Sequence, residues 1–69
     1  MSRRTTVTVM GKTSDVWVSP AGKGFTASGS VTFKAMGGNE VTKEIQEHGR
    51  SESAALRAWE TTARVVMDY

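Results

Sequence analysis

The sequence predicts an α+β domain in which an antiparallel meander of three or four strands carries one C-terminal helix on one face. Two patterns support this class: apolar residues recur at helical spacing over the last third of the chain, and an earlier segment alternates strictly between apolar and polar residues. Each pattern leaves an apolar face exposed unless the two faces meet. We therefore expect residues 1–69 to form a single domain with the helix packed on the sheet.

The segment from Ser51 to Met67 is the predicted helix. Ser51 is a suitable N-cap, and Glu60 and Arg64 stand four residues apart in the favourable order for an ion pair. At about 100° per residue, one stripe of this helix is apolar and the opposite stripe is polar. The apolar stripe holds Ala55, Leu56, Trp59, Ala63, Val66 and Met67, and the polar stripe holds Arg57, Glu60, Thr61, Arg64 and Asp68.

Two short strands are predicted in the first third of the chain. After a flexible basic arm at residues 1–3, threonines and valines alternate over residues 4–10, which indicates a strand. Residues 11–14 are typical of a turn, and residues 15–19 are predicted as a second strand. Pro20 should end that strand and open a loop that runs to Gly24.

The strongest strand prediction covers Phe25 to Met36. Its inward positions are Phe25, Ala27, Gly29, Val31, Phe33 and Ala35. Gly29 should mark a bend or a close approach of the helix, with Trp59 placed over Ala27 and Gly29. A hairpin turn at residues 37–39 leads to a last strand at residues 40–46, in which Val41 and Ile45 face inward and Lys43 suggests a sheet edge.

Residue types exclude most site chemistry. The chain has no cysteine and one histidine, so thiolate ligands are absent and a nucleophile–base pair could use only His48. Glu44 and Glu47 would point to opposite faces of a strand and cannot converge on a metal. We expect no enzymatic activity, no metal and no organic cofactor. The N-terminus lacks the apolar run of a signal peptide, and no segment reaches transmembrane length, so we expect a cytoplasmic protein with no membrane partner.

Charge is distributed unevenly along the chain. Residues 1–37 contain five basic residues and one acidic residue, whereas residues 38–69 contain four basic and six acidic residues, and the net charge is +2. This asymmetry is compatible with contact to a polyanion or an acidic surface, and also with an ordinary mixed surface. The sheet face away from the helix should be rich in hydroxyl groups and lack the aromatic residues that stack on bases. Its expected members are Thr6, Thr8, Thr26, Ser28, Ser30, Thr32 and Lys34.

The order of strands followed by a helix loosely resembles three families. Gly49-Arg50-Ser51 followed by Ala54-Ala55-Leu56 is similar to the antitoxin HicB, which continues with a strand that is absent here. The same order resembles the second half of double-stranded-RNA-binding domains, except that Glu52 and Ser53 replace their lysine pair. It also resembles the arm-binding domains of integrases, which read DNA. These resemblances cover topology and not motifs.

Two functions remain. The first is a small non-catalytic module that binds a larger protein partner, such as a stoichiometric inhibitor of the phage or mobile-element accessory type, for example an anti-CRISPR protein. The alternative is a nucleic-acid-binding domain that uses the basic N-terminal arm and the hydroxyl-rich sheet face.

The predicted partner-binding residues are Arg3, Arg4, Trp17 and Lys23. Tryptophan and arginine are enriched at interfaces, provided that the tryptophan is not part of the core. A five-residue strand fixes its phase poorly, so Trp17 either points outward or packs inward with Val16 and Val18 outward. An exposed sheet edge could equally make a homodimer by strand addition.

Overall fold

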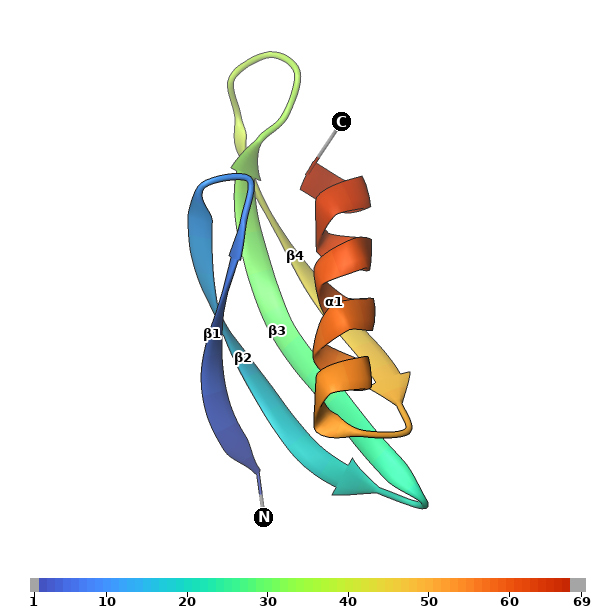
Figure 1. Ribbon diagram of the computed structural model, residues 1–69. Coiled ribbons are helices and arrows are strands. Elements are labelled where there is room, and N and C mark those ends of the chain that lie inside the picture. Colours follow the sequence, from blue (N-terminus) through green and yellow to red (C-terminus); the bar gives the residue numbers. More distant parts are fainter. Residues whose placement is uncertain (1, 68–69) are drawn as a thin grey trace.

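The computed structural model describes residues 2–67 and contains one antiparallel sheet covered by one helix. The strands β1 (Arg3–Val9), β2 (Lys12–Ala21), β3 (Gly24–Lys34) and β4 (Glu40–Gly49) lie side by side in sequential order, and α1 (Glu52–Met67) lies along one face, mainly over β3 and β4 (Figure 1). The predicted α+β class and meander are confirmed. Asp68, expected on the polar stripe of the helix, lies outside the described residues.

The core lies between α1 and the sheet, and Trp59 is at its centre. Its side chain is 0% exposed, and its indole N–H donates a hydrogen bond of 3.1 Å to the carbonyl oxygen of Ile45. A Cβ atom on Gly29 would lie 3.2 Å from the Trp59 ring and 2.6 Å from the carbonyl oxygen of Asp15, so this position requires glycine. The predicted close approach of the helix at Gly29 is therefore confirmed. The other buried apolar residues are Val9, Val16, Val18, Ala27, Val31, Phe33, Ile45, Ala55 and Ala63.

The turn between β1 and β2 is shorter than the sequence predicts. Met10 and Gly11 both have positive φ angles, 52° and 80°, as a two-residue type I′ turn requires. The prediction of a turn at residues 11–14 was wrong because Met10 is not a typical residue for this conformation. As a result, β2 begins at Lys12 instead of residue 15 and is ten residues long.

Pro20 does not end β2 as predicted, but pairs with Phe25 within the sheet. The pairing of β1 with β2 ends at Arg3 and Val18, so at Pro20 the strand has only one neighbour. Proline has no backbone N–H, and on the side of β2 without a neighbouring strand no N–H is needed for sheet hydrogen bonding. The loop expected from Pro20 to Gly24 is reduced to a turn at Gly22 and Lys23.

The N-terminal end of α1 confirms the predicted cap. The backbone N–H of Ala54 donates to Ser51 Oγ at 3.1 Å, and the predicted pair of Glu60 and Arg64 has an N–O distance of 3.3 Å. Arg3, expected in a flexible arm, is instead the first residue of β1, and its guanidinium lies 2.7 Å from the carboxylate of Glu52. This ion pair joins the start of the sheet to the first turn of the helix.

Replacing Ser51 with alanine should lower the free energy of unfolding by about 1 kcal/mol, because the N–H of Ala54 loses its side-chain acceptor. Ser51→Gly should lower the free energy of unfolding by only about 0.3 kcal/mol, because glycine is an acceptable N-cap. Urea denaturation followed by circular dichroism measures both values. Equal losses for the two variants would contradict the capping role.

Candidate functional site on the outer face of the sheet

The outer face is the side of the sheet opposite α1. Side chains alternate along each strand, so the residues between the core positions point to this face. Two hydroxyl pairs lie across neighbouring strands, Thr8 with Thr13 at 3.2 Å and Thr32 with Thr42 at 3.0 Å. The expected hydroxyl-rich face is therefore present, but it also carries residues that the sequence reasoning did not place there. These are Thr13, Asp15, Trp17, Thr42, Glu44 and Gln46.

Trp17 points outward. Val16 and Val18 are 0% and 1% exposed, whereas Trp17 is 46% exposed, so the inward alternative is wrong. The physical reason lies in the register, which pairs Val16 with Gly29 and Val18 with Ala27. Gly29 lies against the Trp59 ring, and Val16, Val18 and Ala27 belong to the same buried cluster as Trp59.

Of the four predicted partner-binding residues, Arg4 and Trp17 are brought together. They are cross-strand partners, and the guanidinium carbon of Arg4 lies 6.0 Å from the centre of the Trp17 ring, at the outer limit of a cation–π contact. Arg3 points to the helix side, where it pairs with Glu52. Lys23 lies in the turn after β2, separated from Trp17 by about 14 Å of strand.

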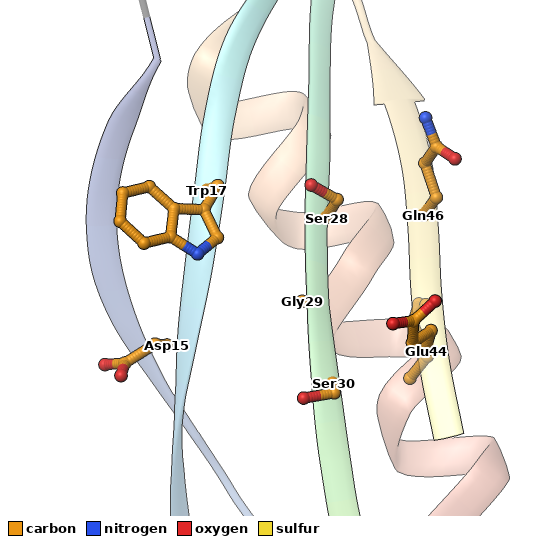
Figure 2. Close-up of a pocket in the computed structure, with 8 residues that line it drawn as sticks. Asp15, Trp17, Ser28, Gly29, Ser30, Glu44 and Gln46 are labelled. Carbon is orange, nitrogen blue, oxygen red and sulfur yellow. The ribbon is translucent and has the colours of Figure 1, made fainter. Parts of the chain in front are cut away.

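A hollow of about 670 Å³ opens on the outer face beside Trp17 (Figure 2). Its floor is the middle of β3, where Ser28 and Ser30 carry small side chains and Gly29 contributes only backbone. Asp15 and Trp17 on β2 form one side, and Glu44 and Gln46 on β4 form the other. Figure 2 shows the Trp17 ring and the Asp15 carboxylate turned away from β3, which leaves the floor open.

The hollow is acidic on a chain that is positive overall. Asp15 and Glu44 line it, and no lysine or arginine does. Within residues 2–67 the ion pairs are Arg3 with Glu52 and Arg64 with Glu60. In this part of the chain, neither Asp15 nor Glu44 is paired with a basic side chain. The sequence did not predict this pair of acids, because their proximity depends on the register of three strands. Asp15 and Trp17 are two residues apart on one strand, so an outward Trp17 implies an outward Asp15, and this was the signal in the sequence that could have placed Asp15 on this face.

His48, the one histidine of the chain, lies beside Thr26 on this face. The hydroxyl of Thr26 lies 3.4 Å from Nδ1 of His48, which is longer than a productive nucleophile–base contact. Within residues 2–67 no three His, Cys, Asp or Glu side chains are grouped so that they could hold a metal ion. In the same part of the chain, no helix is both long and apolar enough to span a membrane.

The chain matches no protein-family model, and no curated protein and no solved structure shows significant similarity to it. The geometry of the outer face is therefore the basis for assigning a function.

Proposed function

We propose that this protein is a non-catalytic module that binds a larger protein partner through the outer face of its sheet, with Trp17 as the anchor. The observation that carries this proposal is the half-exposed Trp17 beside an open hollow. A tryptophan on one wall of a surface depression is typical of binding hot spots, where aromatic residues become buried by the partner. The module acts stoichiometrically by covering its partner's surface, and inhibition of that partner is one consequence.

The setting of Trp17 supports this role. Its ring adjoins the Arg4 guanidinium, and this contact favours one orientation of the indole before a partner arrives. The core does not need the ring, because Trp59 and the valines of β2 fill the space under the helix. A large apolar side chain is thus kept on the surface without a role in packing.

The alternative, nucleic-acid binding, is less favoured by the charges of this face. Phosphate groups approaching the hollow would meet Asp15 and Glu44, which repel them. Of the expected basic arm, Arg3 is paired with Glu52 on the other side of the sheet. A mobility-shift assay with random duplex and single-stranded oligonucleotides at low and moderate salt tests this alternative, and a retarded, salt-sensitive complex would support it.

Affinity capture from cells that naturally produce the protein tests the proposed function. The parent protein should recover a partner in stoichiometric amount, and Trp17→Ala should reduce recovery about tenfold or more, as loss of a hot-spot residue does. Val65→Ala is the matched control, because Val65 is an apolar side chain that is 62% exposed on α1. Cross-linking followed by mass spectrometry should place the partner on β2, β3 and β4.

Equal recovery by the parent and Trp17→Ala would contradict the proposal. Arg57→Glu serves as a second control, because Arg57 is exposed on α1, on the other side of the sheet, and its substitution should leave recovery unchanged. Light scattering of the purified protein would detect a homodimer formed by strand addition at β1 or β4, the two sheet edges.

A further inference from the structure

We infer that the hollow receives a basic side chain, arginine or lysine, from an extended segment of the partner protein. This inference rests on the proposed function, and it adds the chemistry of the occupant. It follows from the shape of the hollow, from its charge and from the position of Trp17.

The shape suits one long side chain inserted from an extended segment. Ser28, Gly29 and Ser30 make a low floor along β3, which is bordered by larger side chains of β4 and by those of β2, which are turned away from it. A segment lying above β3 can therefore direct one side chain down between these walls. The hollow is open, so the segment needs no rearrangement of the sheet to enter.

The charge selects a cation. Asp15 and Glu44 belong to the two strands that flank β3, so their backbones are about 10 Å apart. Figure 2 shows the Asp15 carboxylate turned away from β3, but this side chain is exposed and can rotate toward a guanidinium or ammonium group that is seated beside Glu44. Charge-assisted hydrogen bonds of this kind are stronger than neutral ones. The hydroxyl oxygens of Ser28 and Ser30 and the amide oxygen of Gln46 are further acceptors.

Trp17 completes the site. Its ring is turned away from β3 and adjoins Arg4, so the aliphatic part of an incoming arginine or lysine side chain packs against the side of Trp17 that borders the hollow, and the carboxylates hold the charged group. Arg4 is the cross-strand partner of Trp17 on β1, so its positive charge lies across β2 from the floor of the hollow. Arg4 contributes one positive charge beside the site, and the two carboxylates that line the hollow contribute two negative charges.

Nuclear magnetic resonance titration of the isotope-labelled protein tests this occupant. The probes are four blocked pentapeptides of glycine with a central arginine, lysine, glutamate or alanine. The arginine and lysine peptides should bind weakly, shifting the indole N–H signal of Trp17 and the amide signals of residues 28–30. The glutamate and alanine peptides should leave these signals in place, and added salt should weaken the cationic complexes.

The double variant Asp15→Asn with Glu44→Gln should bind the cationic peptides about tenfold more weakly, because it keeps the shape of the hollow and removes both charges. The matched control is Glu52→Gln with Glu60→Gln, which changes the net charge equally but alters α1 instead of the hollow. Its affinity should remain within about twofold of the parent value.

Three results would overturn the inference: no response to either cationic peptide, equal weakening by both double variants, or an equal response to the glutamate peptide. If the peptides fail while Trp17→Ala still abolishes capture of the partner, the occupant is wrong and the proposed function stands. If Trp17→Ala leaves capture unchanged, the proposed function fails whether or not the peptides bind.

Discussion

Replacing Trp59 with alanine should lower the free energy of unfolding by about 3–5 kcal/mol, the range measured for large aromatic residues in protein cores. The side chain is 0% exposed and lies over Gly29, so its removal leaves a cavity that no neighbouring side chain on β3 can fill. A domain of this length has a total stability of about 3–10 kcal/mol. We therefore expect the variant to be largely unfolded at room temperature, as measured by circular dichroism and urea denaturation.

Trp17→Ala is the control for this prediction, because it removes the same side chain from the opposite face of the sheet. Trp17 is 46% exposed and should contribute no more than about 1 kcal/mol. Trp59→Phe should fall between these variants, because it retains most of the apolar volume and loses the N–H that donates to Ile45. If Trp59→Ala and Trp17→Ala melted at similar temperatures, the position of the core would be wrong.

The helix and its contact with the sheet could be predicted from sequence because each depends on local patterns. The apolar stripe of the helix contains the buried residues Ala55, Trp59 and Ala63. The small residues of β3 indicate where the Trp59 ring can lie close to the sheet. Ser51 is a typical cap that needs no knowledge of the rest of the chain. These features follow from spacing within one element, and spacing is visible in the sequence.

The hollow could not be predicted, because it depends on how strands are aligned with one another. Register places Glu44 beside Ser30, and the outward phase of Trp17 places Asp15 on the same face. That phase is decided by packing, since the core beneath Trp59 accepts valines at positions 16 and 18. The turn at Met10 and Gly11 also lacks the usual turn residues, so the length of β2 was underestimated.

Gly29 links the core to the candidate site. On the helix side its missing side chain allows Trp59 to approach the backbone of β3, and on the outer face its backbone forms part of the floor of the hollow. The sheet is one layer thick, so these two surfaces share the same strand. A change that displaces β3 to relieve crowding under the helix should therefore also reshape the hollow.

Replacing Gly49 with alanine should lower the free energy of unfolding by about 3 kcal/mol or more, at the upper end of the cost of overpacking. A Cβ atom at this position would overlap the backbone nitrogen of Ala55 and lie 2.6 Å from the carbonyl carbon of Ala54. These are backbone atoms of the first helical turn and cannot rotate away. The link between β4 and α1 must open, which also disturbs the cap formed by Ser51.

Gly22→Ala is the matched control. Gly22 has a φ of 59°, and a Cβ atom there would have nothing within 4 Å, so alanine adds conformational strain without a clash. That strain costs about 1–2 kcal/mol. Urea denaturation of the two variants should thus give a clearly lower midpoint for Gly49→Ala. Equal midpoints would mean that the strand and the helix can separate at little cost, and that the close contact at Gly49 does not fix the position of α1 on the sheet.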